Sequence, residues 1–337
     1  MKKHFCIILL SCLFYLANAQ EEKPLVVATA SMIADMAENI GGSFFEIKSI
    51  VPIGGDPHIY EPTPGDAVLA SKANLVLRNG LTFEGWLNEL IENSGTTAEI
   101  VRVTEGIPPI TSLAYENAPD PHAWMDAEYG IIYAENIKNA MQRLAPEYEK
   151  ELEFNFNAFK STLQNLHKLI VESINTIPEK RRVLITSHDA FQYYGRKYGL
   201  QLESILGTST DAQAQTSDIV RLNKVIKSSQ VPSVFIETTV NPKLLKQIAY
   251  DNNVKIGGKL FSDSIGDPDS EAPTYVDMLK YNTETIVKAL TQEPDSNDAP
   301  ESNENTSSSK WIWIIPALIL LALLTLFIIR KKSNDAA

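Results

Sequence analysis

The stretch Leu25-Val26-Val27-Ala28-Thr29-Ala30 decides the fold, because it is a short apolar run followed directly by helical spacing between Ile33 and Ile40. The same order, a short apolar run and then a helical segment, recurs along the chain. Strands that alternate with helices predict an α/β fold with parallel sheets. Further strands are expected at 47–53, 75–78, 99–103, 182–186, 202–206, 234–237 and 255–257. Further helices are expected at 64–73, around 87–91, from about 126, and at 191–198, 219–228, 242–251 and 275–290.

One segment, Glu147 to Asn175, differs from the rest because it runs without Gly or Pro until Pro178 ends it. Its apolar residues recur at helical spacing, at Leu152, Phe156, Phe159, Leu163, Leu166 and Ile170. A helix of this length spans about 44 Å and exceeds an ordinary globular helix. We therefore predict two α/β lobes, residues 20–145 and 179–292, each with a parallel sheet and flanking helices. One long rigid helix within 146–178 joins them.

The N-terminus reads as a secretory signal peptide, residues 1–19. It has two early lysines, an apolar run and the cleavage pattern Ala17-Asn18-Ala19. Both cysteines, Cys6 and Cys12, lie within it, so the mature chain has neither a disulfide nor a thiolate ligand. An alternative that stays open is a lipoprotein signal in which Cys12 is lipidated.

The C-terminus carries a second special segment, because residues 311–329 contain no charged side chain. As a helix they span about 28 Å, close to the thickness of a bilayer core. Trp311 and Trp313 lie at the start of this run, and Arg330-Lys331-Lys332 follow it. We predict a single transmembrane helix with residues 330–337 as a cytoplasmic tail, so that the main part of the chain is exported and extracytoplasmic. Residues 293–310, rich in Asp, Glu, Ser and Asn, are predicted to be a flexible linker.

Composition excludes some functions. The chain has 337 residues, of which 44% are hydrophobic and 21% charged, as in ordinary globular proteins. Its net charge of −12 argues against nucleic acid as a partner, because phosphate binding needs a basic face. A monomer is expected.

Two similar turns carry histidine. The stretch Gly54-Gly55-Asp56-Pro57-His58-Ile59-Tyr60-Glu61-Pro62-Thr63-Pro64 contains an Asp-Pro-His turn, and Asp120-Pro121-His122 repeats it, in a chain with only five histidines. Proline stiffens such a turn, and neutral imidazole is the commonest metal ligand. The two turns suggest a metal site built from loops.

Ligands in parallel sheets bind outside the carboxyl ends of the strands. His58, His188 and Asp263 each follow a predicted strand, and His122 lies in a loop ahead of a helix. We predict that these four residues bind a metal. Nitrogen and oxygen donors without sulfur suit Zn²⁺, Mn²⁺ or Fe²⁺. Imidazoles must lose their protons to bind, so affinity should fall as the pH drops through about 6.5. Asp263 has a second reading, as a cap of the following turn.

Other carboxylates have a supporting role in this prediction. Glu237 follows the strand 234–237 and could orient a histidine, and Asp56, Asp120 and Asp126 have similar standing. His167, on the long helix, is expected to be solvated.

Five ordered motifs make the chain resemble the metal-binding solute-binding proteins of ABC importers, the zinc/manganese/iron cluster. The matching segments are 55–64, 120–126, 186–191, 235–242 and 260–275, within a resemblance that covers 25–290. The resemblance implies a C-clamp of two lobes joined by one helix, a metal held between them and delivery to a membrane permease. The family's ligand positions fall on His58, His122, His188 and Asp263.

The chain also departs from that family's patterns. No His-rich loop, which many zinc-specific members carry, follows Pro64, and manganese-selective members place glutamate where this chain has His188. The sequence of the segment 210–217 deviates from the usual pattern of the family, and a C-terminal transmembrane span is atypical of its members. We expect a binding protein rather than an enzyme. The alternatives left open are a surface adhesin with an incidental metal and a metallohydrolase, although no His-Glu-x-x-His motif is present.

Overall fold

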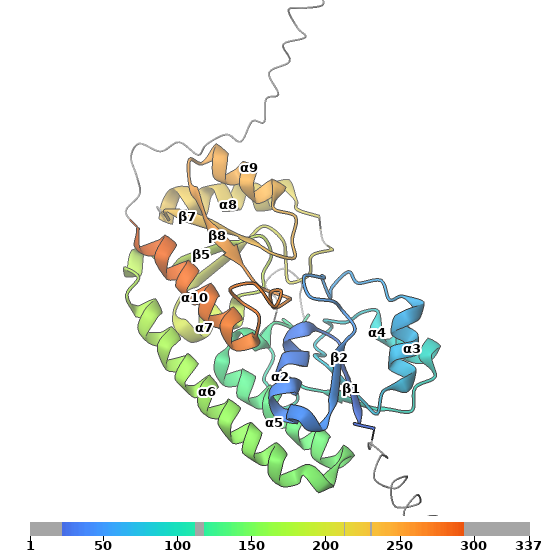
Figure 1. Ribbon diagram of the computed structural model, residues 1–337. Helices are drawn as coiled ribbons and strands as arrows, with labels where there is room; N and C mark the ends of the chain where they lie inside the picture. Colours follow the sequence, from blue (N-terminus) through green and yellow to red (C-terminus); the bar gives the residue numbers. More distant parts are fainter. Residues whose placement is uncertain (1–21, 112–117, 212, 230, 293–337) are drawn as a thin grey trace, which may run out of the picture. The chain divides into compact units, whose positions relative to one another are not determined.

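A computed structural model describes residues 22–111, 118–211, 213–229 and 231–292, which belong to one compact unit (Figure 1). The predicted signal peptide, linker, transmembrane helix and cytoplasmic tail lie outside the described residues. Within the part that is described, no helix combines the length and apolar character needed to cross a membrane.

The elements alternate between strand and helix, as predicted. The strands are β1 Leu25–Ala28, β2 Glu46–Ser49, β3 Leu75–Arg78, β4 Glu99–Arg102, β5 Val183–Thr186, β6 Gln201–Ser204, β7 Ser233–Glu237 and β8 Lys255–Leu260. The α-helices are α2 Ser31–Gly41, α3 Pro64–Lys72, α4 Leu87–Ser94, α5 Ala127–Leu144, α6 Glu149–Asn175, α7 Gln192–Tyr198, α8 Thr216–Ser229, α9 Lys243–Asp251 and α10 Tyr275–Thr291. The short 3₁₀ helices are η1 Gly42–Phe44, η2 Ala123–Met125, η3 Pro146–Tyr148 and η4 Glu179–Arg181.

The N-terminal half, residues 22–145, contains a four-stranded sheet in the order β2-β1-β3-β4, and all its pairs are parallel. Strand β1 is central, and its Val26 and Val27 are fully buried. Strand β2 ends at Ser49, earlier than the predicted end at Ile53. The chain turns there because Pro52 offers no N–H to a ladder and Gly54 has a φ of 79°.

The C-terminal half, residues 179–292, differs from the single parallel sheet that was predicted. It has two parallel two-stranded sheets, β5–β6 and β7–β8, with β5 beside β7. The β7–β8 register shifts at Val234/Phe235. Two glycines in β8 let α10 come close, since a Cβ on Gly257 would lie 2.7 Å from that of Ala289, and one on Gly258 would lie 2.5 Å from a methyl of Thr285.

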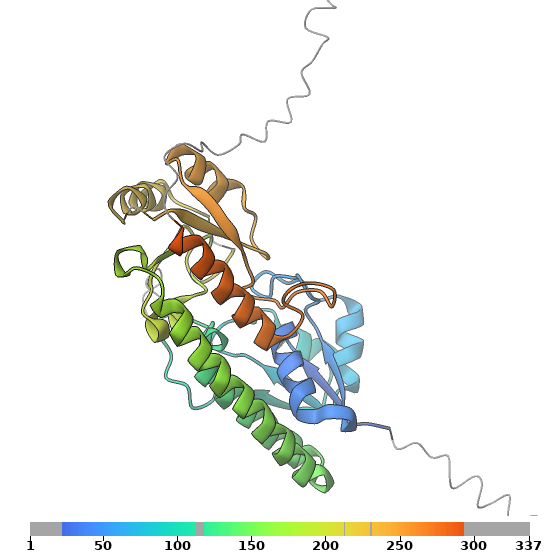
Figure 2. The same cartoon turned by 60° about the vertical axis from the view of Figure 1, so that its left-hand side comes forward.

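Helix α6 runs for 27 residues along both halves (Figure 2). Its buried side chains are Leu152, Phe156, Phe159, Leu163, Leu166, Ile170 and Ile174, which include all those predicted from spacing. They pack against α2, α5, α7 and α10 in the largest hydrophobic cluster of the described residues. That cluster draws on both halves, so their cores are continuous around α6.

Two leucines of α6 test this packing. Leu163 is fully buried, whereas Leu169 is 37% exposed on the same helix. Leu163→Ala should lower the free energy of unfolding by about 2–5 kcal/mol, because it removes core contacts and leaves a cavity. Leu169→Ala should stay within about 0.5 kcal/mol. Urea denaturation of both variants measures the difference, and equal losses would mean that α6 does not face the core as described.

Candidate metal centre

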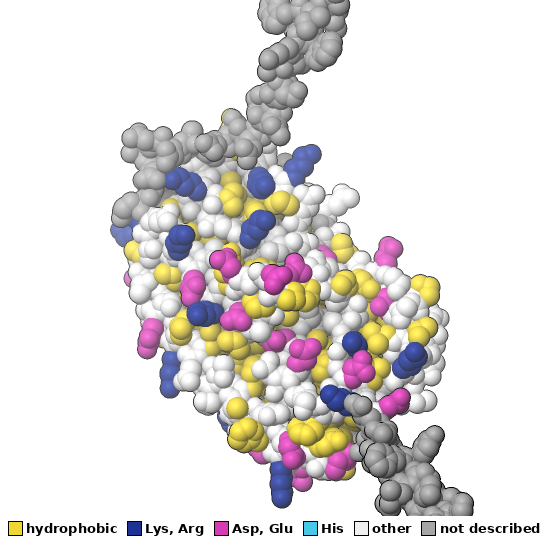
Figure 3. Space-filling view, in the orientation of Figure 1, with side chains coloured by type: hydrophobic (Ala, Val, Ile, Leu, Met, Phe, Trp, Pro, Cys, Tyr) yellow, Lys and Arg dark blue, Asp and Glu magenta, His cyan; other side chains and the backbone are white. Residues whose placement is uncertain are grey.

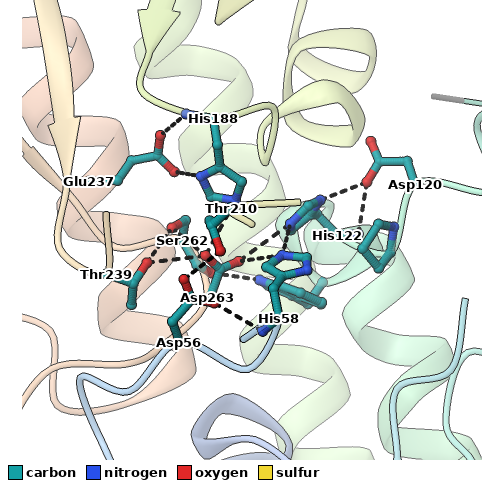
Figure 4. A network of polar contacts seen from close by, with 12 residues as sticks. Asp56, His58, Asp120, His122, His188, Thr210, Glu237, Thr239, Ser262 and Asp263 are labelled. Carbon is teal, nitrogen blue, oxygen red and sulfur yellow. Dashed lines mark hydrogen bonds and ion pairs between the residues drawn. The ribbon is translucent and has the colours of Figure 1, made fainter. Parts of the chain in front are cut away.

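His58, His122, His188 and Asp263 meet at one point, where each offers a ligand atom within 4.8 Å of the others (Figure 4). His58 lies in the loop after β2, and His122 directly precedes η2. His188 follows β5, and Asp263 follows β8. The structure therefore brings together all four residues predicted as ligands, two from each half of the chain.

The spacing of the donor atoms suits a small ion. His122 Nε2 lies 3.2 Å from His58 Nε2 and 3.4 Å from Asp263 Oδ1. His188 Nε2 lies 3.3 Å from Asp263 Oδ2, and His58 Nε2 lies 3.9 Å from Asp263 Oδ1. A tetrahedral zinc ion with bonds of about 2.0–2.1 Å holds its donors about 3.3 Å apart. The donors thus surround a space of the right size for such an ion.

His122 is held by the aspartate of its own turn. Asp120 Oδ1 accepts a hydrogen bond from the His122 backbone N–H (2.9 Å) and contacts the ring Nδ1 (2.8 Å). Asn79, at the end of β3, donates from its side chain to the Pro121 carbonyl (2.9 Å), and Tyr193 donates to the Asp120 carbonyl (3.0 Å). With its proton on Nδ1, the ring directs the Nε2 lone pair into the site.

His188 has an equivalent partner from another strand. Glu237, the last residue of β7, accepts from the His188 backbone N–H at 2.8 Å. Its second oxygen lies 2.6 Å from His188 Nδ1, and both side chains are fully buried. Because Asp120 and Glu237 act alike on two imidazoles, Nε2 is left as the inward atom of each.

His58 is positioned differently. Asp56 Oδ1 accepts from its backbone N–H (2.9 Å), while Asp56 Oδ2 accepts from the Thr210 hydroxyl (2.6 Å). Trp86 donates from its ring to the Pro57 carbonyl (2.8 Å), and the Phe83 ring meets the His58 ring edge-on. Asp56 therefore orders the backbone of this turn rather than the ring. Thr210 belongs to the segment 210–217, whose sequence departs from the family's usual pattern.

Asp263 lies at the centre of the group. Its Oδ2 accepts hydrogen bonds from Ser262 (3.0 Å) and Thr239 (3.1 Å). These partners do not support the alternative reading of Asp263 as a turn cap. Three buried atoms of the group, Asp263 Oδ1 and both ring nitrogens of His188, form no hydrogen bond within the described residues, although His188 Nδ1 lies in ion-pair contact with Glu237. Such unpaired buried polar atoms are costly unless a ligand satisfies them.

Two other residues lie elsewhere. Asp126 caps the N-terminus of α5 by accepting from the Glu128 backbone N–H (2.9 Å), so the structure does not bring it to the site. His167 is only partly exposed, not fully solvated as expected, and its Nδ1 lies 3.4 Å from the Tyr198 hydroxyl. Asp126, Glu128 and His167 form a second group of possible ligands, but Lys197 already contacts both carboxylates.

Several contributors could not be found from sequence. These contributors are of common residue types. Thr239, Asn79 and Trp86 act on partners that lie 24, 42 and 29 residues away in sequence. Ser262 donates to the adjacent Asp263. The one sequence feature that pointed to any of these residues was the position of Asn79 directly after a predicted strand.

The electrostatics of the three imidazoles differ. Burial lowers the pKa of His58 to about 3. Burial also acts to lower the pKa of His122, but Asp120 and Asp263 outweigh it and raise that pKa to about 9. The pKa of His188 is likewise raised, since Glu237 and Asp263 overcome the effect of burial. The two histidines in turn outweigh burial at Asp263 and hold its pKa well below the usual value. Without a metal, the neighbouring carboxylates therefore favour the protonated forms of His122 and His188, whereas burial favours the neutral form of His58.

These directions predict the pH dependence of metal binding. A metal must displace the protons of His122 and His188, so binding at pH 7 should release about two protons. Affinity should rise with pH up to about 9, and its decline on acidification begins above the pH of about 6.5 that the sequence suggested. The stability of the metal-free protein depends on pH in the opposite direction to metal affinity. The stabilisation that comes from the pairing of His122 with carboxylates is complete below about pH 6.5 and is lost as the pH rises through about 9.

Isothermal titration calorimetry in buffers of different ionisation enthalpy measures the protons released. The observed enthalpy should vary with the buffer in proportion to about two protons. Binding heats that are the same in every buffer at pH 7 would contradict this description of the site.

Comparison with known proteins places this geometry in a family. The profile of the family "Zinc-uptake complex component A periplasmic" matches residues 26–289. A manganese ABC transporter substrate-binding lipoprotein, PsaA of Streptococcus mitis, is 34% identical over 280 residues, which cover 81% of this chain and 91% of PsaA. The manganese-binding lipoprotein MntA of Halalkalibacterium halodurans is 35% identical, and the aligned region covers 79% of this chain and 88% of MntA.

Solved structures agree. The periplasmic zinc-binding protein TroA from Treponema pallidum matches with a TM-score of 0.76 and 34% identity, over 80% of this chain and 100% of TroA. A manganese-bound periplasmic metal-binding protein from Candidatus Liberibacter asiaticus matches with a TM-score of 0.74 and 30% identity, over 80% of this chain and 100% of its own. With a family profile that spans most of the described residues and relatives of this identity, the chain belongs to the family of zinc-uptake complex component A proteins.

Proposed function

We propose that this protein is the substrate-binding subunit of a metal ABC importer and carries a divalent transition metal to its permease. The observation that carries the proposal is the group of three imidazole nitrogens and one carboxylate around a space of metal-ion size. Within the described residues, buried Asp263 Oδ1 and His188 Nε2 of this group form no hydrogen bond. His58, His122, His188 and Asp263 would be the ligands. Asp120 and Glu237 would orient two of the rings, and Asp56 would order the turn of the third.

The transported ion is proposed to be Zn²⁺ or Mn²⁺. Three imidazoles and donor spacings near 3.3 Å suit tetrahedral Zn²⁺. The names of PsaA and MntA instead refer to manganese. The donor set also permits Fe²⁺, but the relatives cited above are not named for iron.

The alternatives fit less well. A catalytic zinc site keeps one position open for water, whereas this site offers four protein donors, and the relatives named above are binding proteins rather than enzymes. No observation favours an adhesin in particular.

The ion would lie between two lobes, with boundaries proposed at 20–145 and 179–292 and the bridging helix within 146–178. Each half of the chain supplies two of the four donors. The hydrophobic core is continuous around α6, which argues for release by a small displacement of loops or of one lobe rather than by a wide hinge opening.

A pair of histidine variants tests the ligand assignment. His188→Ala should lower metal affinity by more than the roughly 10–100-fold that loss of an outer partner costs, because it removes a donor atom. His167→Ala is the matched control and should bind like the wild type, since His167 lies on α6 away from the site. Competitive Zn²⁺ and Mn²⁺ titration with elemental analysis measures both affinity and ion preference. Wild-type affinity in His188→Ala would refute the assignment.

We also propose that the C-terminal segment, residues 311–329, anchors the protein to the cytoplasmic membrane. The support is its uncharged length, with aromatic residues at its start and basic residues after its end. The relatives PsaA and MntA are named as lipoproteins, which makes lipidated Cys12 the competing means of attachment.

The two means of attachment are separable in cells. Removal of residues 311–337 should release the protein from the membrane, leave metal affinity unchanged and weaken uptake, because the linker no longer keeps the protein near its permease. Cys12→Ala should leave the protein attached. Fractionation of cells expressing each variant at equal level measures this. Release by Cys12→Ala alone would show that the anchor is lipid.

A further inference from the structure

The charge of the protein is unevenly distributed. Residues 22–145 carry 17 acidic and 7 basic side chains. Residues 219–259 have the opposite balance, with only Glu237 and Asp251 as acids, and Glu237 is buried at the metal centre. The basic residues of this segment are Arg221, Lys224, Lys227, Lys243, Lys246, Lys255 and Lys259. Figure 3 shows Lys and Arg side chains gathered over the end of the molecule formed by α8 and α9.

Helices α8 and α9 cover the same face of the C-terminal strands. Leu222 and Ile226 of α8 pack with Leu245 and Ile248 of α9 and with Val234 of β7 in one hydrophobic cluster. The sides of the two helices that face away from this cluster therefore point to the same side of the molecule.

The outward residues recur at helical spacing. On α8 they are Val220, Lys224 and Lys227, and on α9 they are Lys243, Lys246 and Tyr250. All six are exposed, with Val220 at 62% and Tyr250 at 57%. We call these six residues the α8–α9 face.

Within the part of the chain that the structure describes, the four lysines of this face have no acidic partner. No ion pair among the described residues engages Lys224, Lys227, Lys243 or Lys246, whereas neighbouring Arg221 pairs with Glu203. A face that combines unpaired lysines with an exposed aromatic and an exposed aliphatic residue is complementary to anionic lipid headgroups. Lysines attract their phosphates, and tyrosine favours the interface between water and acyl chains.

The position of the chain end favours a membrane over an acidic protein. Arg181 of η4 donates to the Gln292 carbonyl (2.9 Å), just beyond the end of α10. Both η4 and the last turn of α8, including Val225 and Ser228, line one surface depression. Gln292, the last residue described before the proposed linker, therefore lies near the C-terminal end of α8, the helix that carries Lys227 of the α8–α9 face. The 18 residues 293–310 give a separation of about 20–25 Å from a membrane if they behave as a flexible chain.

We propose that the α8–α9 face binds the anionic surface of the membrane and so orients the acidic N-terminal half away from it. The proposal takes the proposed anchor as one of its supports, but its test does not depend on the anchor, because the test uses a protein without residues 293–337. Residues 22–292 contain all three hydrophobic clusters of the described structure and are used as a folded unit.

The experiment is co-sedimentation of residues 20–292 with vesicles. Binding to vesicles of phosphatidylcholine mixed with phosphatidylglycerol is expected at low salt, with little binding to phosphatidylcholine alone. Charge reversal at Lys224, Lys227, Lys243 and Lys246 to Glu should lower the partition coefficient by about 100-fold or more, since each of the four lysines near an anionic surface contributes about fivefold. Added salt should weaken binding by screening.

The control variant carries the same change in net charge elsewhere. Lys48, Lys72, Lys150 and Lys168, all exposed outside the α8–α9 face, are replaced by Glu, and this variant should retain most of the binding. A second variant, Val220→Ser with Tyr250→Ser, should bind more weakly without a change in charge. Unchanged metal affinity shows that each variant is folded. Failure of the wild type to bind anionic vesicles at low salt, or equal loss in both charge variants, would overturn the proposal, and the first result would leave an acidic protein as the partner of this face.

Discussion

The carboxylate of Asp263 is the constraint on which the centre of the molecule depends. Removing an ion from water costs several kcal/mol unless opposite charge and hydrogen bonds compensate it. Asp263 is 1% exposed and lies among three imidazoles, with two hydroxyl donors on one oxygen and none on the other. The raised pKa values of His122 and His188 favour the protonated rings that would supply this opposite charge when no metal is present. A divalent ion can replace those protons, so capture of the metal is linked to proton release. It is also linked to the distance between the two halves, because each half supplies two of the four donors.

The surroundings of the imidazoles divide them into two kinds. His122 and His188 each have a buried carboxylate against Nδ1, which keeps Nε2 directed at the centre. His58 lacks such a partner for its ring, and its turn is held instead through backbone contacts and the hydroxyl of Thr210. Carboxylate partners also raise the basicity of a ligating ring. The site therefore combines two strongly oriented donors with one whose turn depends on contacts from both halves of the chain.

The metal centre and the α8–α9 face belong to different parts of one charge distribution. The acidic N-terminal half and the carboxylates of the site attract cations, while the outer sides of α8 and α9 are basic. Fields of this kind act over about 8–10 Å at physiological salt. A protein oriented by its basic end would present the acidic half away from an anionic membrane, where it meets metal ions in solution.

The order of strands and helices, the buried stripe of α6 and the four residues that meet at the centre could be derived from the sequence. Each depends on local information: periodicity, two stiff Asp-Pro-His turns and the position of polar residues after strands. Tertiary structure alone decided the end of β2, the splitting of the C-terminal strands into two sheets, and the partners of each imidazole. Asp126 and Asp120 look alike in sequence, yet only Asp120 contacts an imidazole of the metal centre, because Asp126 is used to cap α5. Hydrogen-bond partners and pKa values arise from residues that are distant along the chain, so they follow from packing and from the exclusion of water, which no local pattern encodes.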